Sequence, residues 1–189
     1  MKKYLITGVA GSGKSTVCKQ LTSMRYESHG IEDLDGMFVM YRKGTREVFE
    51  DYDNSDPEKI KNSEWVCDIN KLKELLEKQE QGIAFYCGVA SNMNDLIPLF
   101  DKVILLKANR DTLQKRLINR EGTGDMGTTE ASRQTVLGWK DWWENQMTEK
   151  NGNQLIGDGL ETILHTDQFR EAMDMVSEAA FVAVFQAQD

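Results

Sequence analysis

Residues 8–15 read Gly-Val-Ala-Gly-Ser-Gly-Lys-Ser and satisfy the pattern Gly-x-x-x-x-Gly-Lys-[Ser/Thr]. Glycines in such a run let the backbone curl, so that several N–H groups point inward at one anion. The Lys14 ammonium would reach the β- and γ-phosphates of a nucleotide, and the Ser15 hydroxyl would lie on Mg²⁺. We therefore predict that this loop binds a nucleoside triphosphate. The expected nucleotide-binding residues are Gly8, Gly11, Ser12, Gly13, Lys14, Ser15 and Thr16.

The loop has the neighbours that this chemistry needs. Lys3–Thr7 is apolar enough for a short buried strand, and a helix is expected from Ser15 to about Met24. Val17 and Leu21 fall with Met24 on one face of that helix. The positive end of the helix dipole would therefore add to the anion site.

Two carboxylates are expected near the loop. A second strand would end in Asp33-Leu34-Asp35, and alternation along an extended chain would put both carboxylates on one side. The carboxyl ends of parallel strands line the ligand crevice, so we assign Asp33 to the metal and Asp35 to the acceptor. The alternative is an acidic loop that caps a helix beginning near Met37. In proteins with this phosphate-binding loop, the third strand usually ends in an Asp that supports Mg²⁺. Cys87 stands at about that place here, so the metal-supporting role is expected to move to Asp33 or Asp35.

Basic side chains supply the opposite charge. Arg116 and Arg120 lie four residues apart on a helix that starts near Arg110, and a Gly-rich stretch follows at 121–128. Stacked arginines beside a flexible segment are what a closing lid over a triphosphate needs, here about 119–135. Arg42 and Arg46 are assigned to the acceptor. A plain solvated surface is the alternative for both pairs. The predicted catalytic residues are Lys14, Asp33, Asp35, Arg116 and Arg120, and Arg116 is also predicted to contact the nucleotide.

Further apolar runs indicate the remaining elements. Strands are expected at 83–87, 101–106 and 160–165, and residues 37–64 look polar and irregular. Helical spacing predicts three further helices, which lie at about 64–79, from Thr129 onward, and from Asp167 to about Val184. Five strands that alternate with helices predict an α/β fold with a doubly wound parallel sheet, in a single domain of residues 1–189.

The bulk composition restricts the class of partner. A net charge of −8 and a pI near 4.9 argue against sequence-independent electrostatic binding to nucleic acid or to an anionic membrane. The three cysteines have no Cys-x-x-Cys spacing, which favours a reducing compartment. Neither a signal peptide nor a membrane span is indicated, so a cytoplasmic monomer or homodimer is expected.

The chain resembles P-loop nucleoside- and nucleotide-kinase-like proteins, the relatives of adenylate, shikimate and gluconate kinases. Three features carry the resemblance: Gly8–Ser15 followed by Thr16, the Asp33-Leu34-Asp35 pair, and the helix with Arg116 and Arg120. The resemblance implies sheet order 2-3-1-4-5 and transfer of the ATP γ-phosphate to a small acceptor. It also implies an acceptor-binding segment at about 36–64 and an adenine site near Thr166–Gln168. The triple glycine of shikimate kinases is not reproduced at Gly88-Val89-Ala90.

The expected activity is therefore that of an ATP- and Mg²⁺-dependent kinase that acts on a nucleoside, nucleotide, sugar acid or hydroxy acid. The alternative is a regulatory nucleotide-binding protein or an NTP hydrolase without an acceptor. Asp33–Gly36 fits the GTPase pattern Asp-x-x-Gly but follows the loop too closely, and an Asn-Lys-x-Asp motif is absent from the sequence. An AAA-type motor would need an acidic pair at the end of the third strand and a larger helical domain, and the sequence indicates neither.

Overall fold

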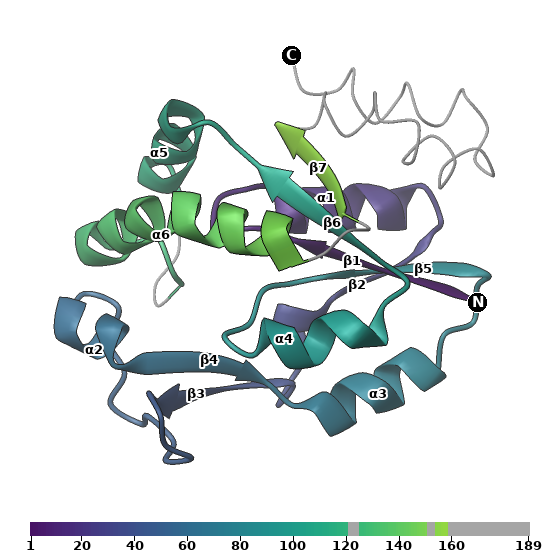
Figure 1. Cartoon of the computed structure of the whole chain (residues 1–189), viewed down its shortest axis with the longest axis horizontal. Helices are drawn as coiled ribbons and strands as arrows, with labels where there is room; N and C mark the ends of the chain where they lie inside the picture. Colours follow the sequence, from purple (N-terminus) through teal and green to yellow (C-terminus); the bar gives the residue numbers. More distant parts are fainter. Residues whose placement is uncertain (121–124, 151–153, 159–189) are drawn as a thin grey trace.

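The computed structural model describes residues 1–120, 125–150 and 154–158, and a five-stranded parallel sheet forms its centre (Figure 1). The strands lie in the order β2-β5-β1-β6-β7, and each neighbouring pair is parallel. Counted along the sequence, these sheet strands have the order 2-3-1-4-5. The predicted α/β class with a parallel sheet is confirmed. Their bounds are Lys2–Thr7 (β1), Glu27–Gly30 (β2), Ile83–Cys87 (β5), Lys102–Lys107 (β6) and Gln154–Asp158 (β7).

Helices cover both faces of the sheet. Alternate residues of β1 divide between two cores: Tyr4 and Ile6 pack with α1 (Lys14–Ser23), whereas Leu5 packs on the opposite face. The core around Leu5 takes side chains from α3 (Ile69–Glu77), α4 (Met93–Leu96) and α6 (Glu130–Lys150). A third core joins α5 (Arg110–Ile118) to α6 and includes Val9. The loop after β1 is therefore anchored to α5 and α6 through its second residue.

The segment 37–67 differs from the sequence-based expectation. Instead of an irregular stretch and the start of a long helix, it forms an antiparallel pair of strands, β3 (Phe38–Arg42) and β4 (Ser63–Cys67). The short helix α2 (Pro57–Lys61) lies between them in sequence. Trp65, expected on a helix with Ile69, lies on β4, and its ring stacks on Phe38 at a centroid distance of 5.2 Å. The helix begins later because Asp68 accepts the N–H groups of Asn70 and Lys71 as its N-cap.

Two further expectations need correction. The second strand ends at Gly30, and a 3₁₀ turn (Ile31–Asp33) follows, so the Asp33–Asp35 segment is not one extended chain. The last described strand lies at 154–158, before the range of 160–165 in which the sequence predicts a strand. The strand expected at 160–165, the adenine site near Thr166–Gln168 and the C-terminal helix lie outside the described residues.

A second 3₁₀ turn (Ile97–Leu99) leads from α4 toward β6. In the part of the chain that the structure describes, no helix is both long enough and apolar enough to span a bilayer.

The Glu27 carboxylate ties the edge strand β2 to the turn before β5. It accepts the backbone N–H groups of Glu80 and Gln81 at 2.8 and 2.7 Å, and it lies 3.2 Å from His29 Nε2. Burial would raise the pKa of this carboxyl, but hydrogen bonds from Gln81, His29 and Glu80 outweigh burial and lower it.

Replacement of Glu27 by glutamine is therefore expected to lower the free energy of unfolding by about 1 kcal/mol at pH 7. The folded-state pKa of Glu27 lies below its ordinary value of 4.5, so the ionised carboxylate stabilises the fold above about pH 4.5. This contribution is lost as the pH falls through the folded-state pKa. Urea unfolding of both proteins from pH 7 to pH 3 measures the effect, and a difference that stayed constant over this range would contradict it.

Candidate functional site

The carboxyl ends of the parallel strands meet at one edge of the sheet, and the loop of residues 8–13 leaves β1 at that edge. Gly11 and Gly13 have φ angles of 79° and 106°, a region that favours glycine. A Cβ on Gly11 would also lie 3.0 Å from the side chains of Leu113 and Leu117. Glycine at position 11 therefore lets the loop pack closely on α5.

Lys14 is buried at the start of α1, with 7% of its surface exposed. Its Nζ donates to the carbonyl oxygens of Gly8 at 2.9 Å and Val9 at 3.4 Å. The ammonium is thus held across the loop, at the place where the sequence motif requires a cation.

The first turn of α1 has the features of an anion site. Gly13 is its N-cap and supplies no side-chain cap, and the turn contains no acidic residue. The N–H groups at a helix start have no partner within the helix, so they are available to a phosphate. Ser12 Oγ is buried and has no hydrogen-bond partner among the described residues. The residues present therefore fit a polyphosphate.

A resident metal ion fits this edge less well than one carried by a nucleotide. Within the described residues, no three His, Cys, Asp or Glu side chains gather closely enough to hold a metal ion. Mg²⁺ at nucleotide sites commonly takes one or two protein ligands besides phosphates and water. The exposed Ser15 and Asp33, which were predicted as its ligands, suit such a shared ion.

The structure separates the two predicted aspartates. The Asp33 carboxylate lies over Gly30 at the end of β2, where a Cβ on Gly30 would be 2.7 Å from Asp33 Oδ2. Cys18 Sγ of α1 lies 4.0 Å from the same Cβ position, so the carboxylate and the thiol both approach Gly30. Asp35 is exposed beyond it and has no hydrogen bond or ion pair with any described residue. The division of roles between Asp33 and Asp35 stays a prediction.

Sequence reasoning missed a third carboxylate, that of Glu32. Its Oε1 accepts the backbone N–H of Val89 at 2.9 Å, and its side chain passes over Gly88. Glu32 therefore brings a carboxylate to the end of β5, next to the position where Cys87 replaces the expected acid. No sequence signal pointed to it, because the contact depends on the 3₁₀ turn after β2.

The two predicted lid arginines have different surroundings. Arg116 extends from α5 over the loop, and its Nη1 donates to the Ser12 carbonyl at 3.4 Å. Arg120 instead holds the segment after α5, donating to the Met126 carbonyl at 2.9 Å and pairing with Asp125 at 3.4 Å. The structure thus brings Arg116, but not Arg120, into contact with the candidate nucleotide site.

Arg42 and Arg46, the predicted acceptor ligands, lie on and beyond β3. The Arg42 guanidinium pairs with Asp51 at 2.7 Å and lies 4.1 Å from the centre of the Phe49 ring. Arg46 is exposed in the turn that follows, and its side chain makes no ion pair or hydrogen bond with the described residues. The structure does not bring either of them to the loop of residues 8–13, and their acceptor role stays a prediction.

Two buried thiols, those of Cys18 and Cys87, belong to the core between α1 and the sheet. Cys18 of α1 lies 3.2 Å from the Ser28 hydroxyl and shares a hydrogen bond with Cys87 at the end of β5. The bond from Cys87 lowers the pKa of Cys18 to about 6, and Ser28 assists, whereas burial and Asp33 oppose the shift. Cys67 lies elsewhere, and burial with the nearby Asp68 carboxylate raises its pKa to about 12.

Because the thiolate is the reacting form, Cys18 is expected to alkylate with a pH midpoint near 6. Peptide mapping after brief iodoacetamide pulses at different pH values measures the midpoint, since burial slows the reaction without moving it. Cys67 serves as the internal control and should remain unlabelled at neutral pH. A Cys18 midpoint near the ordinary value of 9.0 would contradict the expectation.

Comparisons with known proteins agree with this architecture. A family model described as "AAA domain" matches residues 5–138. The crystal structure of TT1252 from Thermus thermophilus is similar, with 17% identity, a TM-score of 0.54, and coverage of 93% of this chain and 98% of that one. This likeness supports the fold.

Other solved structures show weaker similarity. A shikimate kinase from Bacteroides thetaiotaomicron has 12% identity and a TM-score of 0.48, with 92% of this chain and 97% of that one covered. A gluconokinase from Sinorhizobium meliloti 1021 has 17% identity and a TM-score of 0.47, with 99% and 98% covered. No curated protein sequence matches the chain.

Proposed function

The chain belongs to the AAA domain family, and from this premise we propose that it is an ATP- and Mg²⁺-dependent phosphotransferase that acts on a small acceptor. One observation carries the proposal: a buried lysine is held across a glycine loop whose helix presents uncapped N–H groups. The resemblance to P-loop kinase-like proteins is confirmed at the level of family and fold.

Phosphoryl transfer depends on positioning and on neutralisation of charge, and the proposed roles follow from this need. The loop N–H groups and Lys14 would bind the β- and γ-phosphates. Arg116 contacts the loop at the Ser12 carbonyl, and its guanidinium would stabilise the charge of the group in transfer. Ser15 and Asp33 would hold Mg²⁺, which supplies further charge neutralisation when it is bound with the nucleotide.

The acceptor would bind between the loop of residues 8–13 and the β3–β4 pair. Strand β4 is fixed to the segment after β5, where the Trp65 N–H donates to Ser91 Oγ at 2.9 Å and the Cys67 N–H donates to Asn92 Oδ1 at 3.0 Å. This attachment supports the proposed acceptor-binding segment at 36–64. Asp35 or Glu32 would take the proton of an attacking hydroxyl, because both residues follow the carboxyl end of β2, at the edge of the sheet where the nucleotide loop lies.

The experiment is a measurement of ADP release from ATP and Mg²⁺ with a panel of nucleosides, nucleotides, sugar acids and hydroxy acids. The expected result is that one class of acceptor raises ADP release and appears as its phosphorylated product. Absence of a phosphorylated product for every class, together with ADP release that no acceptor changes, would overturn the proposal.

The second candidate is an NTP hydrolase or regulatory nucleotide-binding protein without an acceptor. Membership of the AAA domain family is compatible with this class as well as with a motor. Strand β5 ends in Cys87 and not in the acidic pair that a motor would need, which argues against the motor. Steady ADP release in the absence of any acceptor would favour this candidate.

A further inference from the structure

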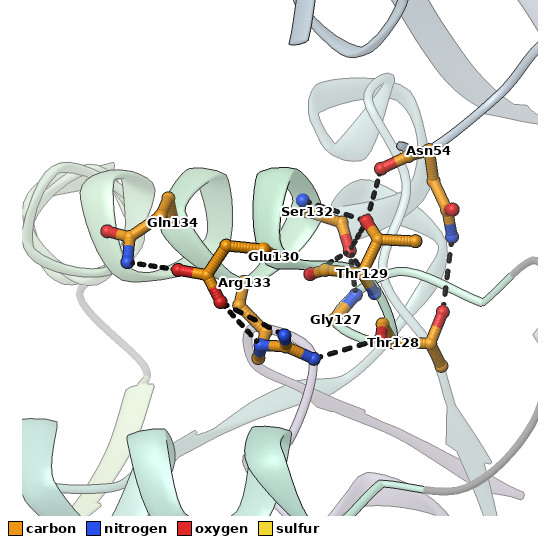
Figure 2. Close-up of polar contacts among 8 residues, drawn as sticks. All are labelled: Asn54, Gly127, Thr128, Thr129, Glu130, Ser132, Arg133 and Gln134. Atoms are coloured by element: carbon orange, nitrogen blue, oxygen red, sulfur yellow. Dashed lines mark hydrogen bonds and ion pairs between the residues drawn. The ribbon is translucent and has the colours of Figure 1, made fainter. Parts of the chain in front are cut away.

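Asn54 joins two parts of the fold that lie far apart in the sequence. It precedes α2 in the proposed acceptor segment and is buried, with 5% of its surface exposed. Its side-chain Nδ2 donates to the Asp125 carbonyl at 2.7 Å and lies 3.4 Å from Thr128 Oγ1. The Thr129 hydroxyl donates to the Asn54 backbone carbonyl in return (Figure 2). Both the side chain and the backbone of Asn54 are therefore engaged by residues 125–129.

The partner segment is itself tightly organised. Thr129 precedes α6, and the Ser132 N–H donates to Thr129 Oγ1 while Ser132 Oγ accepts the Gly127 and Thr129 N–H groups. Arg133 donates to the Thr128 carbonyl at 2.9 Å and pairs with Glu130 at 3.0 Å (Figure 2). These bonds make residues 127–133 one connected unit at the start of α6. A displacement of Thr129 therefore moves the whole unit.

The same segment is also held by α5 and by Arg120, which lies two residues after the end of α5. Arg120 donates to the Met126 carbonyl and pairs with Asp125, the residue whose carbonyl Asn54 binds. Gly127 also lies against Leu117, because a Cβ at that position would be 2.5 Å from Leu117 Cδ2. Arg116, which contacts the Ser12 carbonyl, lies on the same helix. A continuous path of bonds and packing thus runs from Asn54 through residues 125–127 and α5 to the nucleotide loop.

We propose that Asn54 is a positioning residue that couples the acceptor segment to Arg116 on α5 and to Arg120 just after α5, so that nucleotide at the loop orders the acceptor segment. The inference rests on the proposed function and assigns a role to a residue that makes no contact with the nucleotide loop itself. Coupling between the nucleotide loop and the acceptor segment requires one connected element whose conformation both sites influence. The start of α6, which is hydrogen-bonded to Asn54, is that element.

The test compares Asn54→Asp with the full-length parent protein. Aspartate keeps the size and the backbone carbonyl of Asn54 but removes both side-chain N–H donors and introduces a charge. Asn62→Asp is the matched control, because Asn62 is exposed in the same segment and its side chain donates to the Glu58 carbonyl instead. Asn54→Ala removes the donors without a charge and is used if the aspartate variant does not fold.

Hydrogen exchange is measured with and without Mg²⁺ and a non-hydrolysable ATP analogue. In the parent protein and in Asn62→Asp, the nucleotide is expected to slow exchange at 8–16, at 110–120 and also at 54–61. In the Asn54 variant, the slowing at 8–16 should remain, and the slowing at 54–61 should fall at least threefold. Once an acceptor is identified, its kcat/KM should fall about tenfold, whereas the affinity for the ATP analogue should stay within twofold.

Each outcome has a distinct meaning. Nucleotide-dependent slowing at 54–61 that survives in the Asn54 variant would overturn the coupling, even if the variant unfolds at a lower temperature, because a merely structural role predicts this pattern. Loss of the slowing in the Asn62 variant as well would also overturn it. No slowing at 8–16 in the parent protein would instead contradict the proposed function, and the role of Asn54 would fall with it.

Discussion

Replacement of Lys14 by alanine is expected to lower ATP turnover by roughly 10²–10³-fold. The Lys14 ammonium is the one motif cation that the fold holds across the loop of residues 8–13, through its bonds to the Gly8 and Val9 carbonyls. Without it, the charge that develops on the phosphates is left to the N–H groups of the loop and to Arg116. Steady-state rates of ADP release, together with the affinity for ATP, measure the loss.

The fold should survive this substitution. Loss of hydrogen bonds to two carbonyl groups is expected to cost about 1–2 kcal/mol in the free energy of unfolding, which thermal unfolding can measure. Lys19→Ala is the matched control, because Lys19 is exposed on the same helix α1. An unchanged turnover in Lys14→Ala, or an equal loss in Lys19→Ala, would reject the role of Lys14.

Replacement of Asp33 by asparagine is expected to raise the Mg²⁺ concentration required for half-maximal activity by 10- to 100-fold. Asparagine keeps the size of Asp33 and its place over Gly30 but removes the charge that a hard cation prefers. Rates at saturating ATP are to be measured over a range of Mg²⁺ concentrations. A Mg²⁺ dependence that is unchanged in Asp33→Asn would contradict the assignment.

Asp35→Asn is the natural comparison, since the two side chains are two residues apart and both are exposed. With Asp35 on the acceptor side, its variant should show an altered KM for the acceptor and the same Mg²⁺ dependence as the parent protein. The reverse pattern in the two variants would exchange their roles and assign the metal to Asp35.

The parallel sheet was predictable because its signals are local. The strands of residues 2–7, 83–87 and 102–107 are short apolar runs, and each is followed by a turn or by a helix with its own cap. The loop of residues 8–13 was predictable for the same reason, because consecutive residues determine both the glycine conformations and the helix that follows. These parts of the fold depend little on distant contacts.

The β3–β4 pair was missed because distant contacts decide it. Trp65 falls at helical spacing with Ile69, and the spacing predicted one helix. In the structure Trp65 stacks on Phe38, and its backbone N–H donates to Ser91, far along the chain. Pairing of this kind has no periodic signature in the sequence of either strand, so the tertiary contacts override the local preference.

The candidate site was predictable in its phosphate-binding half and less so elsewhere. A sequence motif identifies Lys14 and Ser15, whereas Glu32 reaches the end of β5 through a 3₁₀ turn that the sequence did not indicate. Asn54 was not singled out either, since asparagine in a turn-rich acidic stretch is ordinary. Its burial depends on residues more than 70 positions later in the chain.

The most direct test of the account is a calorimetric titration of the parent protein with ATP in the presence of Mg²⁺. The account predicts one binding site per chain, with a dissociation constant of roughly 1 μM–1 mM, and a much weaker site or none in Lys14→Ala. Absence of binding heat for ATP, GTP and their diphosphates at several temperatures, or equal binding by Lys14→Ala, would contradict it.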